Sequence, residues 1–572
     1  MGAFAFVNDS KARSLCHQSR SKPIPLTWSY RVKKENGKFV KFKARLCLRG
    51  DLQKNGSLAE KDLYSPVIRQ DSLRLLLSHA LQQGFTMNSY DVPCAYLFAK
   101  PSQPTVVYAP SQLRDRGRFM QLKKNLYGGI ESAQTWNNHL HERLTKSMGL
   151  TQSSIDPCVY FNDDRTVIIM IYVDDALLLA RDDSLREHYD QQLINLYNIK
   201  CNGPLKHFLG VEYSKDGNNL FLSQSGTIKD LAAMYNRPSV PTATTPYRRQ
   251  PKNGQPFDLS KTTSDPTAIK QLFIDNKCDL PRLVGSLLHI AKNTRPDIET
   301  AVSRIARYVS KPSEEVIQEG LHVLDYLNNT TNLGLHIRPH DNQPIEAYVD
   351  SSYMTENSTH GCSRYGYVVY INGTPITTKS THHISPSYST TEAEYIALGQ
   401  AHRTIIPINH LLAEIRQLPL SDETFQNNLH LRLHEDNKPT ISVIEKKQIQ
   451  QSRLRTTLGY QYKLREDFDS GYLTISSVKT ADQLADIFTK CGQTKAQFAN
   501  IRNFLVRPQN DETPVEFRDN NNNTENLKNM YNTMYSPATT QEEDGGNDNK
   551  QEKEQIQNKP MTATANDNRA PT

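Results

Sequence analysis

The amino-acid sequence predicts an α+β protein built from several folded units. Between residues 24 and 235, apolar runs of strand length alternate with stretches of helical periodicity. Helical periodicity then dominates residues 280–336, and strand patterns return at Ile345 and continue to a last helical stretch near Leu505. Because a folded domain takes roughly 100–200 residues, a chain of 572 residues has room for about three or four such units.

The first part of the chain contains clear local signals. Residues 1–23 look like a ragged leader. Tyr30–Val32 and Lys38–Phe42 have strand character, and the Asn36-Gly37 pair between them is typical of a hairpin turn. Leucines then recur at helical spacing along Asp71–Leu81, which predicts a helix with one buried face.

Two segments have the composition of a linker and of a tail. Residues 237–268 are rich in Pro, Thr and Ser and poor in apolar residues, so we expect a linker or a long surface loop there. Residues 509–572 contain thirteen Asn and few apolar side chains, which is too little to bury for folding. This tail is therefore expected to be disordered.

The composition argues against membrane and secretory classes of protein. No apolar run reaches the roughly 18 residues of a membrane helix, and residues 1–9 lack the order of a signal peptide. The eight cysteines show neither zinc-site spacing nor a disulfide framework. We therefore expect a reducing compartment and no membrane contact.

Charge is distributed unevenly along the chain. Residues 1–50 carry a net charge of +10, and residues 510–572 carry a net charge of −6, within a total of +7. A basic body suits a polyanion such as nucleic acid, because each phosphate contact releases counterions. A basic, solvated surface without any partner would show the same charge.

The segment Val167–Ala180 carries the strongest chemical signal. Two apolar runs flank Asp174 and Asp175, which predicts a hairpin of buried strands with both carboxylates at its tip. Adjacent buried carboxylates repel one another unless a cation neutralises them, and a divalent metal is the natural solution. The alternative is an ordinary Asp-Asp turn, but the flanking runs are too apolar for a hairpin that faces solvent.

A second acidic position strengthens the interpretation as a metal site. Asp91 ends the strand-like run that begins at Phe85, and the aromatic residue Tyr96 follows five residues later. Three carboxylates from two strands could hold two Mg²⁺ ions about 4 Å apart. One ion would activate a primer 3′ hydroxyl, and the other would neutralise a triphosphate and its leaving pyrophosphate.

These residues also resemble a known family. Tyr172-Val173-Asp174-Asp175 resembles the catalytic motif of reverse transcriptases, and the blocks around it resemble copia-type LTR retrotransposon Pol polyproteins in the same order. Those blocks are Trp28-Ser-Tyr-Arg-Val, Lys43-Ala-Arg45-Leu-Cys-Leu-Arg49-Gly, Asp91-Val-Pro-Cys-Ala-Tyr96-Leu, Leu126-Tyr127-Gly128, Trp136, Phe208-Leu-Gly-Val-Glu-Tyr213 and Leu283-Val-Gly-Ser-Leu-Leu288. The likeness covers about residues 24–505.

The resemblance implies an order of domains. It places the fingers and palm of a right-hand polymerase at residues 24–236, and a linker with thumb or connection helices at 237–340. A ribonuclease H-like α/β domain is expected at 341–508, followed by the disordered tail.

The resemblance also implies roles in a polymerase site. Asp91, Asp174 and Asp175 are the implied metal ligands, and Tyr96 is the aromatic that excludes a ribose 2′ hydroxyl; a plain core aromatic is the alternative. The implied triphosphate contacts are Lys43, Arg45 and Arg49, which could equally touch the template backbone. Glu131 stands where the family usually has a Gln against the incoming nucleotide, and a carboxylate there would repel a triphosphate unless it stays protonated or turns away.

A second set of carboxylates resembles the copia-type ribonuclease H. Asp350 ends a strand, Glu394 lies in a predicted helix, Asp436 follows an alternating strand, and Asp486 lies in the block Gln483-Leu-Ala-Asp-Ile-Phe-Thr-Lys. The family match makes these four the ligands of two further metal ions, with Glu392 as a rival to Glu394. Any one of them alone would be read as surface charge.

Together these features predict an RNA-directed DNA polymerase with ribonuclease H activity that uses Mg²⁺, with Mn²⁺ as an alternative, at two ions per site. The implied partners are an RNA template, a DNA primer, the RNA–DNA hybrid, deoxynucleoside triphosphates and particle proteins of the same element. The expected location is a cytoplasmic virus-like particle or the nucleus. A decayed copy that binds nucleic acid without polymerising is the alternative, as is a non-catalytic particle protein.

Overall fold

The computed structural model of the chain describes residues 2–35, 38–53, 63–248, 261–339, 344–354, 362–384, 386–421, 429–446, 455–491 and 493–511. The predicted turn at Asn36-Gly37 and almost all of the predicted tail lie outside the described residues. Helices and sheets alternate along the described chain, which confirms the α+β class. None of the helices in these ranges is both long and apolar enough to cross a bilayer.

The N-terminal residues form regular structure, and the expectation of a ragged leader is wrong. They form β1 (Phe4–Val7) and α1 (Asp9–Gln18), and β1 lies at the edge of a three-stranded sheet beside β6 (Phe119–Leu122) and then β5 (Val106–Tyr108). The Asn8 side chain caps α1, and Ala12 and Leu15 pack against this sheet. The partner strand lies more than a hundred residues away, so local periodicity could not reveal the pairing.

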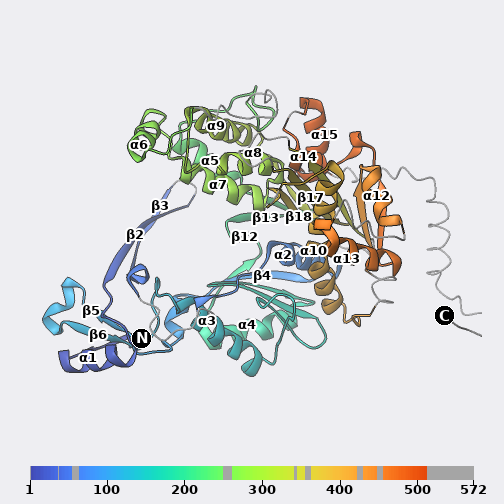
Figure 1. Cartoon of the computed structure of the whole chain (residues 1–572). Coiled ribbons are helices and arrows are strands. Elements are labelled where there is room, and N and C mark those ends of the chain that lie inside the picture. Colours follow the sequence, from blue (N-terminus) through green and yellow to red (C-terminus); the bar gives the residue numbers. More distant parts are fainter. Residues whose placement is uncertain are drawn as a thin grey trace, which may run out of the picture. The chain divides into compact units, whose positions relative to one another are not determined.

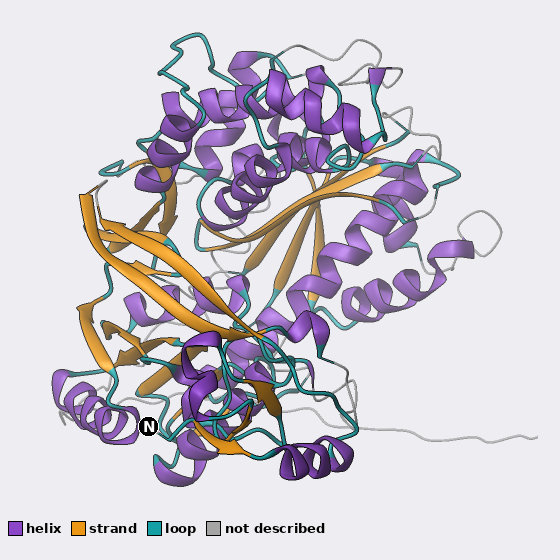
Figure 2. Ribbon diagram, turned by 90° about the vertical axis from the view of Figure 1, so that its left-hand side faces the viewer, coloured by secondary structure: helices purple, strands orange, loops and turns teal. Residues whose placement is uncertain are grey.

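A long two-stranded ribbon follows, made of β2 (Leu26–Glu35) and β3 (Lys38–Leu48) (Figures 1 and 2). Its register pairs Arg31 with Lys43 and Ser29 with Arg45, so one face is basic. Tyr30 and Phe42 lie on the other face and are 72% and 79% exposed. The ribbon is therefore longer than the sequence predicts, and both of its faces reach solvent.

The central sheet has the strand order β11-β4-β10-β9-β8-β7. Its strands are β4 (Thr86–Asp91), β7 (Thr151–Gln152), β8 (Val159–Phe161), β9 (Val167–Tyr172), β10 (Asp175–Ala180) and β11 (Lys200–Pro204). The helices α2 (Gln70–Gln82), α3 (Ser132–Glu142) and α4 (Asp183–Tyr197) belong to the same region.

The strands β9 and β10 are buried on both faces, which explains their uninterrupted apolar sequences. Ile168 and Leu177 belong to the core that contains the leucines of α2, whereas Ile169 and Leu178 belong to the core that contains Trp136 of α3. The two faces of one hairpin thus join two hydrophobic cores.

A second, five-stranded sheet connects the two halves of the chain in the order β12-β13-β14-β15-β21. Its strands are β12 (His207–Phe208), β13 (Val211–Asp216), β14 (Asn219–Ser223), β15 (Leu333–Ile337) and β21 (Arg507–Pro508). The accompanying helices are α5 (Ser225–Met234), α6 (Pro266–Asp275), α7 (Leu280–Asn293), α8 (Glu299–Ala306), α9 (Glu314–Asn329) and α15 (Lys495–Leu505).

The last sheet is mixed and has the order β18-β17-β16-β19-β20, that is, 3-2-1-4-5 by its position in this part of the chain. Its strands are β16 (Ile345–Ser352), β17 (Arg364–Ile371), β18 (Thr374–His382), β19 (Leu431–Glu435) and β20 (Leu473–Ser477). The helices are α10 (Thr390–Ile415), α12 (Lys438–Glu445), α13 (Leu458–Asp469) and the short α14 (Asp486–Thr489). The first three strands are antiparallel neighbours, and β19 and β20 run parallel to β16.

Candidate active sites

Three of the predicted carboxylates meet at one edge of the central sheet. Asp175 begins β10 and lies opposite Asp91, the last residue of β4. The backbone N–H of Val92 donates to the carbonyl oxygen of Asp174 at 2.7 Å, which ties the tip of the hairpin to the end of β4. The pairing of the strands therefore brings together the acidic residues that the sequence places more than eighty residues apart.

The tip of this hairpin is a tight turn with an unusual backbone. Val173 has φ of +57°, in the left-handed region that β-branched residues rarely adopt. The indole N–H of Trp136 donates to the carbonyl oxygen of Val173 at 2.6 Å, and Trp136 itself is buried. Trp136 thus supports the turn that presents both aspartates.

The electrostatics of this edge favour a cation. Burial, together with the neighbouring Asp174 and Asp91, raises the pKa of Asp175 to about 6. Oxygen-rich sites with crowded negative charge are the kind that Mg²⁺ prefers. The residues present therefore fit the divalent metal that the sequence predicts.

Two aromatic rings form a wall beside these carboxylates. Tyr96 lies on a 3-10 turn, and its ring meets that of Tyr127 edge to face at 4.7 Å between centroids. Burial and the nearby Asp174 carboxylate raise the pKa of Tyr127 to about 12, and they raise the pKa of Tyr96 as well. Tyr127 is a wall of the site that sequence reasoning missed, although it lies in a block matched to the family.

The end of β3 is fixed to this wall by a close backbone contact. Leu48 donates its N–H to the carbonyl oxygen of Tyr127 at 2.8 Å, and Gly128 has φ of +86°. A Cβ atom at Gly128 would lie 2.3 Å from the carbonyl oxygen of Leu48, so only glycine fits. This contact holds Arg45 with its guanidinium 4.9 Å from the centre of the Tyr127 ring.

The other predicted triphosphate contacts are placed less directly. Lys43 lies on the same ribbon face as Arg45, whereas Arg49 is turned to Asp51, with 2.6 Å between the guanidinium nitrogen and the carboxylate oxygen. Arg45 is thus the one of the three with a contact to the Tyr127 ring. The triphosphate roles of Lys43, Arg45 and Arg49 stay predictions.

The second set of carboxylates meets at the end of β16. The parallel register pairs Tyr348 with His434, which brings Asp350 level with Asp436 on the adjacent strand. Helix α10, which carries Glu394, begins at Thr390 and is capped by the Ser389 hydroxyl. One ligand atom from each of Asp350, Glu394 and Asp436 lies within 4.8 Å of the others, and this is the one such group of three within the described ranges.

Asp486 is linked to Asp350 because Lys490 forms ion pairs with both carboxylates. The Lys490 ammonium lies 2.5 Å from an oxygen of Asp486 and 3.4 Å from an oxygen of Asp350, and the Thr489 hydroxyl donates to Asp350. Burial raises the pKa of Asp486 to about 7, and it also raises the pKa values of Asp350 and Glu394. Lys490 therefore supplies a counter-charge in this cluster that sequence reasoning missed, although it ends the block containing Asp486.

Part of the chain matches a known protein family, and most of it is similar to known polyproteins. Residues 14–248 match the family model described as "Reverse transcriptase (RNA-dependent DNA polymerase)". The chain is 28% identical over 461 residues to the retrovirus-related Pol polyprotein from transposon RE1 of Arabidopsis thaliana, covering 80% of this chain and 30% of the relative. It is 27% identical to that of transposon TNT 1-94 of Nicotiana tabacum (82% and 34% covered) and 25% identical to the Ty1-DR5 Gag-Pol polyprotein of Saccharomyces cerevisiae (78% and 25% covered).

Residues 14–248 thus match the reverse transcriptase family, and about four fifths of the chain is similar to Pol polyproteins of copia-type retrotransposons. The chain spans between a quarter and about a third of the length of these relatives. Among solved structures, one of a foamy viral protease-reverse transcriptase in complex with double-stranded DNA matches with a TM-score of 0.42 and 13% identity, over 84% of this chain and 67% of that one.

Glu131 of this chain does not point into open space. Its carboxylate is buried and accepts hydrogen bonds from the backbone N–H of Ser102, at 3.2 Å, and from the Ser102 hydroxyl. The charge that the sequence places against the nucleotide is therefore engaged in a local bond. A role in nucleotide binding stays a prediction.

We expect Glu131→Gln to leave the KM for nucleotide within about twofold, because the carboxylate is held by Ser102. If the carboxylate instead opposed the triphosphate, removing about 1–2 kcal/mol of repulsion would lower KM roughly tenfold. Glu131→Leu should lower the free energy of unfolding by about 1 kcal/mol, since the acceptor for Ser102 is lost. Steady-state extension kinetics and urea unfolding measure both effects.

Glu392, the alternative ligand to Glu394, makes different contacts from Glu394. It accepts a hydrogen bond from the backbone N–H of Tyr388 at 2.6 Å and another from the Thr456 hydroxyl, in the first turn of α10. Glu392 therefore fixes the chain just ahead of the helix, and its negative charge in the first turn is favourable at a helix N-terminus. This leaves Glu394 as the α10 residue in the cluster, as the family match implies.

Glu435 is a further buried acid of this chain that sequence reasoning missed. It ends β19 beside Asp436, accepts from the N–H of Asn437 at 2.9 Å, and has no exposed surface. Burial and the neighbouring Asp436 and Asp350 raise its pKa well above the ordinary value. The cluster thus contains a further acidic residue in addition to the four predicted ligands.

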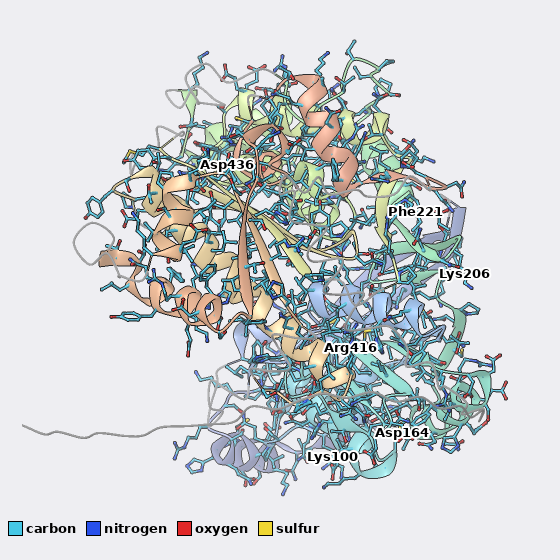
Figure 3. The ribbon with its side chains drawn as sticks, turned by 90° about the vertical axis from the view of Figure 1, so that its right-hand side faces the viewer. Lys100, Asp164, Lys206, Phe221, Arg416 and Asp436 are labelled. Carbon is cyan, nitrogen blue, oxygen red and sulfur yellow. The ribbon has the colours of Figure 1, made fainter. Side chains whose placement is uncertain are left out.

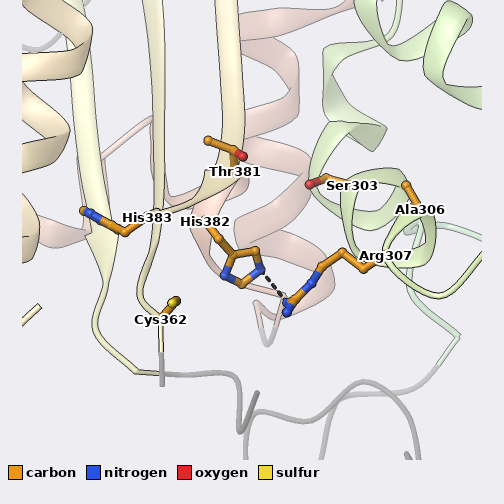
Figure 4. Close-up of a pocket in the computed structure, with 7 residues that line it drawn as sticks. All are labelled: Ser303, Ala306, Arg307, Cys362, Thr381, His382 and His383. Atoms are coloured by element: carbon orange, nitrogen blue, oxygen red, sulfur yellow. Dashed lines mark hydrogen bonds between the residues drawn. The ribbon is translucent and has the colours of Figure 1, made fainter. Parts of the chain in front are cut away.

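A pocket of about 500 Å³ lies between the end of β18 and the C-terminal end of α8 (Figure 4). The residues that line it are Ser303, Ala306, Arg307, Cys362, Thr381, His382 and His383. The Arg307 guanidinium donates to Nε2 of His382 at 2.7 Å. The strand register sets His382 level with Arg364 and Ser352, two residues beyond Asp350 on β16.

The pKa of Asp486 predicts a pH dependence in the absence of metal. Because it is raised from 3.8 to about 7, the folded chain holds more protons than the unfolded chain between these values. Stability should therefore fall as the pH rises from about 4 to about 7, and metal binding should offset the loss. Melting temperatures with EDTA and with Mg²⁺ test this, and Asp486→Asn should flatten the EDTA profile. A steeper profile in that variant would contradict the assignment.

Proposed function

We propose that this chain is an RNA-directed DNA polymerase that also cleaves the RNA strand of RNA–DNA hybrids. The observation that carries the proposal is the pairing of Asp91 with Asp175, next to Asp174, at the tip of a hairpin buried on both faces. This hairpin lies inside the region that matches the reverse transcriptase family.

In the polymerase site, Asp91, Asp174 and Asp175 would hold two Mg²⁺ ions, or Mn²⁺ in their place. Bound ions of this kind lower the pKa of a hydroxyl nucleophile and neutralise charge on the leaving group. Arg45 would donate to the triphosphate from beside Tyr127, with Lys43 on the same face of the ribbon and Arg49 just past the end of β3. Tyr96 lies against the sugar and leaves no room for a 2′ hydroxyl.

In the nuclease site, Asp350, Glu394, Asp436 and Asp486 would hold a second pair of ions, which activate water against an RNA phosphodiester. Lys490 balances part of their charge while the hybrid is absent. Asp350 and Asp436 lie at the ends of adjacent parallel strands, so they face the substrate together.

The proposed partners follow from this chemistry. They are an RNA template, a DNA primer, deoxynucleoside triphosphates and the RNA–DNA hybrid, together with particle proteins of the same element. The proposed location is a virus-like particle in the cytoplasm, or the nucleus.

A decayed copy that binds hybrid without extending it is the second candidate, because Glu131 replaces the family's usual Gln. The Ser102 contact holds this carboxylate, which weakens that argument. The presence of all seven predicted ligand carboxylates favours the active enzyme. Extension of a DNA primer on an RNA template, with Mg²⁺ and with EDTA, separates the two. The active enzyme extends only with the metal, whereas a folded protein that binds the hybrid and never extends is the decayed copy.

Tyr96→Ala should raise the incorporation of ribonucleotides relative to deoxynucleotides by at least about tenfold, because the ring that fills the space beside C2′ is lost. The ratio of kcat/KM values for the two nucleotide types measures the effect. Tyr96→Phe keeps the ring and should keep the selectivity. An unchanged ratio in Tyr96→Ala would make Tyr96 a core aromatic.

A further inference from the structure

The helix α10 reaches from the nuclease cluster to the central sheet of the polymerase region. It spans Thr390 to Ile415 with Pro407 inside it, and Glu394 and Glu414 lie twenty residues apart on it. At 1.5 Å per residue this separation is about 30 Å. Figure 3 labels Asp436 in the nuclease region and Arg416 just beyond the C-terminal end of α10.

Glu414 forms a dock between α10 and the strands of the polymerase region. One carboxylate oxygen accepts from the Ser153 hydroxyl at 2.5 Å, and the other accepts from the backbone N–H of Ser154 at 2.8 Å. The carbonyl oxygen of Glu414 accepts from Nε of Arg165 at 3.2 Å. Gln417, just past the helix, donates to the carbonyl oxygen of Asp163.

The polymerase side of this dock is held firmly. The Arg165 guanidinium lies 3.8 Å from the centre of the Phe161 ring and donates to the carbonyl oxygens of Asn162 and Asp163 at 3.0 Å. A charge-assisted bond to a fixed partner costs little further side-chain entropy. The dock therefore joins one ordered surface to another.

From the dock, a short path leads to the polymerase carboxylates. The N–H of Ser153 donates to the carbonyl oxygen of Val159, and Val159 pairs with Met170 on β9. Met170 lies four residues before Asp174, and β9 ends between them at Tyr172, just before the turn. One helix and one pair of strands thus join Glu394 to Asp174 through hydrogen-bonded elements.

A second contact fixes the same two regions elsewhere. The buried Arg74 of α2 donates to the carbonyl oxygens of Pro375 and Ile376 on β18, and to those of Lys292 and Asn293 at the end of α7. The same two regions also share one hydrophobic core, which contains leucines of α2 together with residues of β16, β17 and α10. Glu414 therefore adds a polar contact at the C-terminal end of α10 to two regions that already pack together.

We infer that Glu414 is a positioning residue that sets the spacing between the polymerase and nuclease sites on one bound hybrid. This inference rests on the proposed function. The measurable consequence is that RNA is cut within a narrow window at a fixed distance from the primer 3′ end. Removing the dock should widen that window while each activity stays near the parent rate.

The test uses the full chain on a labelled RNA template with a recessed DNA primer, with Mg²⁺ and without nucleotides. Glu414→Ala should weaken the association of the α10 end with the Ser153–Ser154 segment by about tenfold. The RNA cuts should then spread over more positions. Glu414→Gln keeps an acceptor for Ser154, so its cutting window should be wider than that of the parent and narrower than that of Glu414→Ala. Glu466→Ala, which removes an exposed glutamate from α13, should leave the window unchanged.

A double-variant cycle makes the test specific. If Ser153 and Glu414 act through one contact, Ser153→Ala combined with Glu414→Ala should widen the window no more than Glu414→Ala alone. An unchanged window in Glu414→Ala would overturn the inference. A parent chain that never cuts RNA would instead contradict the proposed nuclease activity.

Hydrogen exchange tests the dock without any nuclease activity. Glu414→Ala should raise the exchange rate of the Ser154 amide by about tenfold, since its acceptor is lost, and should leave amides of β9 protected. Unchanged exchange at Ser154 would also overturn the inference.

Discussion

Asp174→Asn is expected to abolish primer extension, with a rate at least about 100-fold below the parent, equivalent to about 2.7 kcal/mol in the activation free energy. The change removes one negative oxygen from the proposed metal site and keeps the shape of the side chain. The contacts that hold the turn involve the backbone carbonyl oxygens of Val173 and Asp174, so the fold should be unaffected. Single-nucleotide extension on an RNA template measures the rate.

Binding of the hybrid supplies the control for this variant. The dissociation constant should stay within about threefold of the parent, because phosphate contacts by basic residues dominate affinity. Asp183→Asn, an exposed aspartate at the start of α4, should extend like the parent. Extension by Asp174→Asn at more than a few per cent of the parent rate would refute the ligand assignment.

Asp436→Asn is expected to stop RNA cleavage while primer extension stays within about twofold of the parent. The two sets of carboxylates lie on different sheets, so losing a ligand in one leaves the other intact. The loss of cleavage should reach at least about 100-fold, as for a metal ligand in a two-ion site. A 5′-labelled RNA in a hybrid shows the shortening directly.

The stability of Asp436→Asn distinguishes loss of function from loss of fold. Several acids crowd this cluster, and like charges destabilise one another without a cation. The variant should therefore melt at or above the parent temperature in EDTA. Asp469→Asn, an exposed change at the end of α13, provides the matched control. Persistent cleavage by a folded Asp436→Asn protein would show that Asp436 is no ligand.

The sequence predicts the polymerase hairpin well because its physical signal is local. Val167–Tyr172 and Asp175–Ala180 are apolar throughout, which requires burial on both faces and leaves the two aspartates at the turn. The pairing of Asp91 with Asp175 depends on which strands become neighbours, and periodicity carries no such information. Its place at the end of a strand-like run made Asp91 a candidate third carboxylate, and the resemblance to the family then implied that it is a ligand of the same site.

The residues that sequence reasoning missed owe their roles to tertiary contacts. Phe4 pairs with Leu122, so nothing near the N-terminus could mark it as a strand. Glu435 and Lys490 look like surface charges in the sequence. The burial of Glu435 and the half-buried position of Lys490 follow from the packing of α10 and α14 on the sheet. The orientation of the Glu131 side chain depends on its hydrogen bonds with Ser102. Ser102 is distant in the sequence, and the fold brings the two residues together.

The measurement that tests the central claim most directly uses one RNA–DNA hybrid labelled on both strands, incubated with nucleotides and Mg²⁺. The parent should lengthen the DNA and shorten the RNA, and EDTA should stop both. Asp174→Asn should only shorten the RNA, and Asp436→Asn should only lengthen the DNA. Loss of both reactions in either folded variant, or either reaction in EDTA, would contradict two separate metal-dependent sites in this chain.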